Sequence, residues 1–274
     1  MAIGDISLSS SARQNLSALQ TTAVLLQQTQ AHLSTGKTVN SASDNATAFF
    51  ASRGFLNAAN NLNTIKSNLS TALEAVNSYD NSISSVTMVV NQLQGLVTQA
   101  LGTTDTTTRA GLASQFNALT TQLDTLVNDA TFNGTNLLNS TTNKLVVYFN
   151  ATNTTSLTIT GVNITSAGLM ATSTAASAWA GNTDIQTAQS FLLTALSTLT
   201  TDAANFGGNA TLIQTRQDFT SNLIDSLQNA SNSLTAADTN EEGANLQALQ
   251  AQDQLGIVSL GVSGTLASAI LKIL

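Results

Sequence analysis

Apolar residues recur at alternating spacings of three and four, without a break, from Phe55 to Ala100. A seven-residue repeat that persists this long is typical of a coiled-coil helix rather than of a surface helix in a compact domain. At a rise of 1.5 Å per residue the stretch would measure about 68 Å. We therefore expect an elongated architecture for this chain of 274 residues. The seam that the repeat predicts contains Leu62, Ile65, Leu69, Val76, Ile83, Val86, Val90, Leu93 and Val97.

Further segments carry the same spacing and are predicted to be helices. They run from Leu16 to Leu33, from Leu112 to Ala130 and from Ile185 to Leu234, and a short apolar face ends the chain at Leu266 to Ile273. A proline inside a helix removes a hydrogen bond and disrupts the helix. The chain contains no proline, which fits a bundle of long helices.

Residues 144–164 depart from the helical spacing and contain β-branched and aromatic residues in partial alternation. This pattern favours one or two β-hairpins. Residues 165–183 are small and polar and are expected to form an exposed loop, in which Trp179 is either an exposed aromatic residue or an interface anchor. The predicted fold class is mainly α: an elongated antiparallel bundle or coiled coil of long helices, with a small β-hairpin region in the middle of the chain.

The composition excludes most kinds of active site. The chain has no cysteine and one histidine, which removes thiolate catalysis and zinc–thiolate sites and makes a Ser-His-Asp triad improbable. Only 8% of the residues are charged and the net charge is −7, which argues against nucleic-acid binding, because that binding depends on neutralising phosphates. No glycine-rich phosphate loop or nucleophile elbow occurs. We expect a protein that is not an enzyme and that holds no cofactor and no metal.

The few conspicuous polar residues have structural interpretations. His32 follows the first apolar segment and is expected to lie near a helix C-terminus. Asp238, Glu241 and Glu242 form a tight acidic cluster, and their charge favours the N-terminus of the helix that follows. Neither group predicts a metal site or a pair of catalytic carboxylates.

The N-terminus carries no recognisable targeting segment. The first twenty residues lack the basic region and the apolar stretch of a cleavable secretory signal. No window is apolar enough to predict a transmembrane helix, so no membrane insertion is expected. If export always required a cleavable signal, the protein would be cytoplasmic.

Four motifs stand in order along the chain. They are LSTGKTVNSASDN at residues 33–45, ATFNGTNLL at 130–138, DFTSNLIDSLQ at 218–228 and ADTNEEGANLQALQ at 237–250. Together they resemble the bacterial flagellins, and the first and last are most similar to alphaproteobacterial members of that family. The resemblance extends over nearly the whole chain.

The resemblance implies a structural subunit that is exported unfolded by a type III apparatus and self-assembles into the helical flagellar filament for swimming motility. Its implied location is secreted and flagellar, in place of the cytoplasmic one. The implied partners are further copies of the chain in a homopolymer, other flagellins, an export chaperone, the export apparatus, and the hook–filament junction and cap proteins. A junction or adaptor protein of the flagellar rod and hook is the alternative.

By the same resemblance, residues 1–45 and 235–274 would form the coiled-coil core of the filament. Residues 46–143 and 184–234 would form a rod domain, and residues 144–183 a hairpin and exposed loop on it. The terminal helices have few charges for pairing and several poor helix formers, so we expect them to order only on assembly. Residues expected to pack in the filament core are Leu16, Leu19, Leu26, Leu33, Leu246, Leu249, Leu255, Leu260 and Ile270.

Two expectations concern the exposed surface. Charged residues usually keep a protein soluble, and here hydroxyl groups take their place, either as plain hydrated side chains or as sites of O-glycosylation. In flagellins bound by the vertebrate flagellin receptor, a Leu-Gln-Arg-Val-Arg-Glu-Leu pattern makes the contact, and the resemblance implies that this chain has lost it. The replaced positions are Gly95, Val97 and Thr98, and the candidate glycosylation sites are Thr152, Thr154, Thr155, Ser156, Thr172, Ser173 and Thr174.

Overall fold

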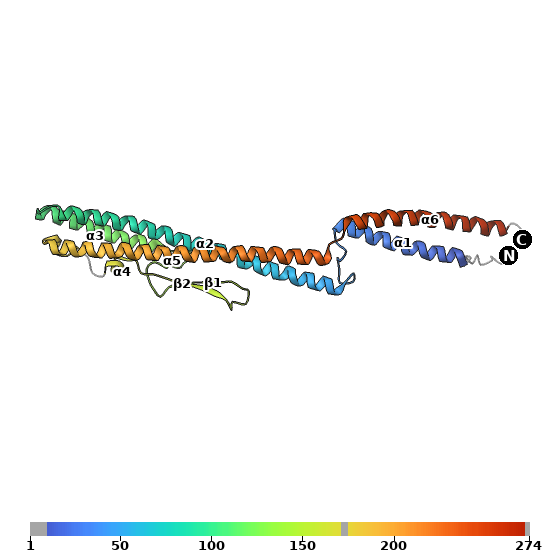
Figure 1. Ribbon diagram of the computed structural model, residues 1–274, viewed down its shortest axis with the longest axis horizontal. Coiled ribbons are helices and arrows are strands. Elements are labelled where there is room, and N and C mark those ends of the chain that lie inside the picture. Colours follow the sequence, from blue (N-terminus) through green and yellow to red (C-terminus); the bar gives the residue numbers. More distant parts are fainter. Residues whose placement is uncertain (1–9, 171–174, 272–274) are drawn as a thin grey trace. The chain divides into compact units, whose positions relative to one another are not determined.

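The computed structural model describes residues 10–170 and 175–271. Long helices dominate this part of the chain, with one two-stranded antiparallel sheet between them (Figure 1). The predicted fold class, mainly α with one β-hairpin, is confirmed. The elements in chain order are α1 (Ser10–Thr35), α2 (Ala46–Leu101), α3 (Thr106–Asp129), β1 (Lys144–Tyr148), β2 (Ser156–Thr160), α4 (Ser166–Met170), the 3-10 helix η1 (Ala176–Trp179), α5 (Asn182–Thr235) and α6 (Thr239–Leu271).

The chain divides into two compact units. The terminal unit contains residues 1–58 and 226–274, and the central unit contains residues 59–225. The sequence placed the corresponding divisions after residue 45 and before residue 235. The difference arises because α2 and α5 continue as unbroken helices through both boundaries, so no turn or change of composition marks them.

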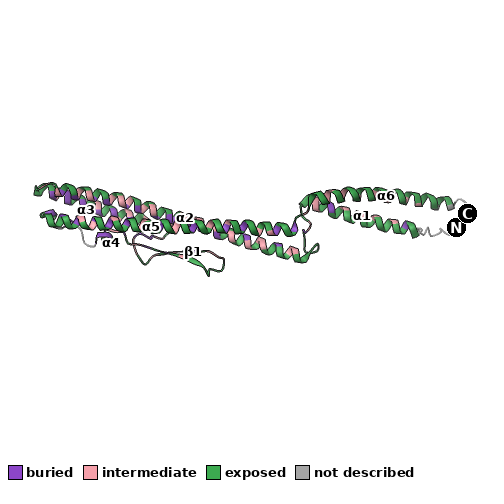
Figure 2. Cartoon of the chain, viewed as in Figure 1, coloured by how far each residue is buried: buried purple, intermediate pink, exposed green. Residues whose placement is uncertain are grey.

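The core of the central unit is the continuous apolar seam of α2, together with the facing residues of α3 and α5. Of the expected seam, Leu62 is half-buried and the other eight residues are buried (Figure 2). The seam of α5 includes Ile185, Leu192, Leu199, Phe206 and Ile213, all of them buried. The same buried cluster also includes Leu137, Val147 and Ile159 from the segment that follows α3, so the hairpin region completes the core beside the three helices.

Polar and aromatic contacts fix the direction of α5 against α2. Lys66 Nζ donates to Ser221 Oγ at 3.0 Å, and Gln217 Nε2 donates to Ser70 Oγ at 2.7 Å. Further along, the ring centroids of Tyr79 and Phe206 lie 6.0 Å apart. As the residue number rises on α2 it falls on α5, so the two helices are antiparallel.

A tight turn explains the second sequence motif. Asn133 and Gly134 have φ values of 50° and 81°, which two consecutive turn residues adopt most readily when they are Asn and Gly. Phe132 and Thr135 on either side exchange backbone hydrogen bonds of 2.8 and 3.0 Å. The Tyr79 hydroxyl donates to the Thr135 carbonyl oxygen at 2.7 Å, so the motif ties this turn to α2.

The β-hairpin packs one of its faces on the helices. Its register pairs Leu145 with Ile159 and Val147 with Leu157, and alternation places these four side chains on one face. Val147 and Ile159 are buried. At the end of β1 the Phe149 ring lies under the guanidinium of Arg216, with Cζ 4.8 Å from the ring centroid. The hairpin is thereby held to α5.

The expected exposed loop at residues 165–183 is only partly right in its described part: residues 180–183 are exposed, but α4 and η1 interrupt the loop and bury several side chains. Leu169, Met170 and Trp179 are all at most 7% exposed. The Trp179 ring packs edge-to-face on Phe116 of α3, with centroids 5.1 Å apart. Trp179 is therefore neither an exposed aromatic residue nor an interface anchor. Small and polar neighbours suggested a surface loop because composition does not show which single side chain turns inward.

Candidate assembly interface

The terminal unit brings together helices α1 and α6 from opposite ends of the chain. The two helices lie side by side and run antiparallel (Figure 1). Asn15 Nδ2 donates to Ser259 Oγ at 2.9 Å near one end of the pair, and His32 meets Glu242 near the other. Gly256 lies directly against Leu19, since a Cβ added there would come within 2.7 Å of a Leu19 methyl carbon.

The contact between α1 and α6 is only partly apolar. Leucines alternate on it with Asn15, Thr22 and Thr29 of α1 and with Asp253 and Ser263 of α6. These polar side chains limit how much apolar surface two helices can bury against each other. The expected core residues Leu19, Leu26, Leu33, Leu246, Leu249 and Leu260 are half-buried in this contact.

The remaining expected core residues lie elsewhere. Leu16 and Leu255 are 38% and 69% exposed, on surfaces of α1 and α6 that no other described element covers. Ile270 belongs to α6, but its side chain lies outside the described part of the structure. The nine residues are thus not equivalent: six line the contact within the chain, and two point away from it.

One side of α6 is an exposed apolar surface, which we call the terminal apolar face. It consists of Leu255, Val258, Val262 and Leu266, spaced by three and four residues and 53–69% exposed. The only charged residue of α6 after Glu242 is Asp253. A contiguous apolar patch with few charges around it marks a site of protein association.

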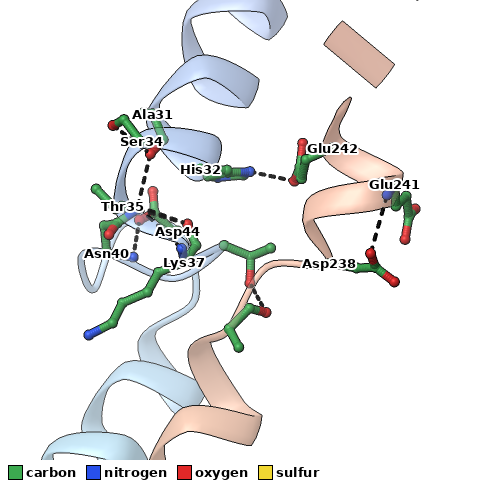
Figure 3. Close-up of polar contacts among 12 residues, drawn as sticks. Ala31, His32, Ser34, Thr35, Lys37, Asn40, Asp44, Asp238, Glu241 and Glu242 are labelled. Carbon is green, nitrogen blue, oxygen red and sulfur yellow. Dashed lines mark hydrogen bonds and ion pairs between the residues drawn. The ribbon is translucent and has the colours of Figure 1, made fainter. Parts of the chain in front are cut away.

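Polar contacts join the C-terminal end of α1 to the start of α6 (Figure 3), where Glu241 and Glu242 lie in the first turn as the sequence predicted. His32 Nδ1 donates to Glu242 Oε1 at 2.7 Å, and both side chains are nearly buried. Asp238 accepts from the backbone N–H groups of Asn240 and Glu241 at 2.9 and 3.3 Å, which caps the start of α6. Periodicity could not have found the His32 contact, because its two residues are 210 positions apart.

The first motif forms the loop between α1 and α2. Asp44 accepts from the backbone N–H groups of Asn40 and Ser41, each at 2.9 Å. These two hydrogen bonds hold the pKa of Asp44 below its usual range, because they favour the ionised carboxylate. The backbone N–H of Thr38 donates to the Thr235 carbonyl oxygen at 2.8 Å. The motif therefore connects the end of α1 to the end of α5.

The remaining expected positions lie on the central unit. Thr152, Thr154, Thr155 and Ser156 are exposed in the hairpin loop and at the start of β2, whereas Thr172, Ser173 and Thr174 lie outside the described residues. Gly95 and Thr98 are exposed on α2. Val97 is fully buried in the seam, so its side chain is not available to a receptor in the folded chain.

Within residues 10–170 and 175–271, no three His, Asp or Glu side chains gather as a metal site would require. None of the helices in that part of the chain has a stretch both long enough and apolar enough to span a bilayer.

Comparison with known proteins gives matches along the whole chain. The family described as "Bacterial flagellin N-terminal helical region" matches residues 6–143. Flagellin FljO of Caulobacter vibrioides is 31% identical over all of this chain and 99% of its own length. A flagellin of Brucella melitensis is 27% identical over 99% of both chains. The crystal structure of Bacillus cereus flagellin is 18% identical, with a TM-score of 0.48 over 56% of this chain and 88% of that one.

Proposed function

The chain belongs to the bacterial flagellins and is a structural subunit of the flagellar filament rather than an enzyme, and we propose that its terminal unit supplies the contacts through which copies polymerise. The observation that carries this proposal is the terminal apolar face. Two helices with a partly polar contact leave this face in water, and further copies of the chain would bury it. Contacts of this face with a different surface of the next copy would generate an open helical assembly.

The same contacts explain why ordering and assembly would be coupled. An amphipathic helix gains most of its stability from packing one face against a partner. The α1–α6 contact supplies only part of this packing, so we propose that the pair is marginal in the monomer and firm in the filament. Limited proteolysis tests this point: α1 and α6 should be cleaved in the monomer and protected in filaments. Equal protection of both helices in the two states would contradict it.

The direct test of the proposal is Leu255→Asp. The substitution places a carboxylate on the terminal apolar face, where the contact between copies would have to bury it unpaired, and we expect no filaments. Because Leu255 is 69% exposed in the single chain, the folded monomer should be unaffected. Filament formation is followed by electron microscopy and sedimentation, and monomer folding by circular dichroism.

The matched control is Gln250→Asp. Gln250 is exposed on the same helix but lies outside the terminal apolar face, so this variant adds the same charge and should polymerise normally. Leu260→Asp makes a second comparison, because Leu260 is half-buried against α1 and its variant should also lower the helix content of the monomer. Normal filaments from Leu255→Asp would refute the proposal.

We further propose secretion through the type III export apparatus, with an export chaperone, other flagellins, and the hook–filament junction and cap proteins as partners. The composition supports passage in an unfolded state. Prolyl isomerisation is a slow folding step that takes tens of seconds, and a chain without proline avoids it. A chain without cysteine also forms no disulfide that would block unfolding. Deletion of the export apparatus in the source bacterium should leave the chain inside the cell.

Two surface properties complete the proposal. The exposed hydroxyls of Thr152, Thr154, Thr155 and Ser156 would carry O-glycans, and an intact mass of filament protein equal to 28.2 kDa would rule this out. The vertebrate flagellin receptor would bind weakly, because Gly95 and Thr98 leave exposed positions of α2 uncharged. Reporter cells should respond to the double variant Gly95→Arg/Thr98→Glu and not to the unmodified monomer, and activation by the latter at nanomolar doses would contradict the idea.

A further inference from the structure

A cavity of about 490 Å³ opens between the β-hairpin and helix α2 in the central unit. One wall is the stretch of α2 from Asn61 to Tyr79, and the opposite wall is strand β1 with the hairpin loop that follows it. The turn at residues 132–135 closes one end. Its volume lies in the range of sites for small organic ligands.

The cavity has an apolar floor and a rim of neutral polar groups. Ile65, Ala75 and Val147 on the floor are at most 6% exposed. The rim carries side-chain amides that form no hydrogen bond with another described residue, and it includes Tyr148 at the end of β1, which is 43% exposed. These free amides belong to Asn61, Asn68, Asn133 and Asn153.

None of the residues that line the cavity is charged. A phosphate, a carboxylate or an ammonium group would enter it without a partner of opposite charge, which is unfavourable in a partly desolvated site. A purely apolar ligand would leave the amides on the rim without hydrogen-bond partners when it displaced their water. The ligand that fits is therefore neutral, rich in hydroxyl groups and apolar on at least one face.

We propose that this cavity binds a neutral saccharide. A side-chain amide offers one acceptor and two donor hydrogens, which match two neighbouring hydroxyls of a sugar ring. The apolar C–H face of the same ring packs on the exposed face of Tyr148, and the floor accepts the remaining apolar surface. The saccharide comes either from a free glycan or from a glycan attached to Thr152 or Thr154, because the loop that carries these hydroxyls also lines the cavity. This inference does not depend on polymerisation.

Saturation-transfer NMR on the monomer tests whether the cavity binds a free glycan. The chain is produced in a host that adds no glycan, as confirmed by a mass of 28.2 kDa. The probes are maltose, lactose and chitobiose, with sialyllactose as a charged comparison. We expect saturable transfer from at least one neutral probe and less from the charged one. Asn68→Ala should weaken that binding about threefold to tenfold, because it removes one hydrogen-bonding group.

Matched variants separate binding from folding. Tyr148→Ala should abolish the transfer, whereas Tyr148→Phe keeps the ring and should retain it. Asn91→Ala changes an exposed asparagine of the same helix outside the cavity and should bind like the unmodified chain. Binding that persists unchanged in both Asn68→Ala and Tyr148→Ala would overturn the proposal.

Binding of a glycan that is attached to the chain itself is tested on protein isolated from its own bacterium. A glycan on Thr152 or Thr154 that occupies the cavity should slow hydrogen exchange at residues 61–79 and 145–148, and Asn68→Ala should reverse this effect. Absence of both free binding and this protection would overturn the proposal. Self-association that requires Tyr148 in the absence of sugar would also overturn it, by assigning the cavity to a contact between copies.

Discussion

Helices of the central and terminal units share the same apolar spacing, but their apolar residues are buried to different extents. Those of the central unit are mostly buried, and those of the terminal unit are mostly half-buried or exposed. In the central unit the seam of α2 includes Val76, Val90 and Leu93 at 0% exposure. In the terminal unit the leucines that face the partner helix are only half-buried, and Leu255 is 69% exposed. Figure 2 shows the contrast as buried residues along α2 and α5 and exposed ones along α1 and α6.

The number of elements that enclose each seam accounts for this difference. In the central unit, residues of α2, α3, α5 and the β-hairpin belong to one buried cluster, so the seam of α2 has neighbours from several elements. In the terminal unit the leucines lie in a contact between two helices, α1 and α6, and its polar residues reduce the apolar area further. A helical repeat therefore predicts which residues form the apolar face of a helix. Whether that face is buried within one chain depends on the elements that surround it.

The largest expected effect is the difference in the free energy of unfolding between Leu93→Ala and Leu255→Ala. Removal of the Leu93 side chain leaves a cavity in a closed core and should lower the free energy of unfolding of the monomer by about 2–5 kcal/mol. Leu255→Ala removes an exposed side chain and should change that free energy by less than about 0.5 kcal/mol. Urea denaturation of both monomers measures the difference. Equal losses would show that the terminal apolar face is already covered in the monomer.

A smaller effect is expected from a buried hydroxyl pair that joins α2 and α5 in the terminal unit. Ser52 and Ser231 are 5% and 2% exposed, and their Oγ atoms lie 2.7 Å apart. Ser52→Ala leaves the other hydroxyl without this partner and should lower the free energy of unfolding by about 1–3 kcal/mol.

The double variant Ser52→Ala/Ser231→Ala should recover most of that loss, because it removes both polar groups together. Denaturation of the two single variants and the double variant completes the cycle. Additive losses would show that the two hydroxyls do not depend on each other.

A smaller difference in helix stability is expected between alanine substitutions at two glycines of α6. Gly261 has nothing within 4 Å of an added Cβ, so Gly261→Ala should stabilise the helix by up to about 1 kcal/mol. At Gly256 the same methyl group would meet Leu19, so Gly256→Ala should gain less or lose stability. Helix content by circular dichroism during thermal unfolding compares the two. An equal gain in both variants would mean that α1 and α6 do not pack closely in the monomer.

The smallest effect should be local and pH-dependent. The pKa of Asp44 is lowered in the folded chain, so its contribution is present above the ordinary value of about 3.9 and is lost as the pH falls through the folded pKa. Below the folded pKa, the protection of the N–H groups of Asn40 and Ser41, measured as their exchange rate relative to the intrinsic rate at the same pH, should decrease. In Asp44→Asn this protection should not change with pH, because the amide does not titrate, and a pH-independent protection in the unmodified chain would contradict this account.

Local pattern accounts for most of what the sequence predicted. The seam from Leu62 to Val97 was identified because neighbours on one helical face lie three or four positions apart, so a short window contains the whole signal. The hairpin followed from the β-branched residues of β1 and β2. The Asn133-Gly134 turn belongs to a motif that also indicated the family. The motif contains Asn and Gly because few other residue pairs adopt the two positive φ values of this turn.

Contacts between distant segments could not be predicted in this way. His32 was expected near a helix C-terminus, where it lies, but its hydrogen bond with Glu242 was not predicted. Trp179 was placed in an exposed loop, and it packs on Phe116. The cavity beside the hairpin combines side chains from α2, the turn at residues 132–135 and β1, and no local pattern shows that these three segments meet.

The sequence alone determined the long helices, the seam residues, the hairpin and the membership in the flagellins, because each of these depends on spacing or on a continuous motif. The tertiary structure determined in which helices the apolar residues are buried. Leu93 faces other helices and is fully buried, whereas Leu260 faces α1 and is only half-buried, and Leu255 lies in water. Burial is a property of the elements that surround a residue, and their number and direction depend on how distant parts of the chain come together.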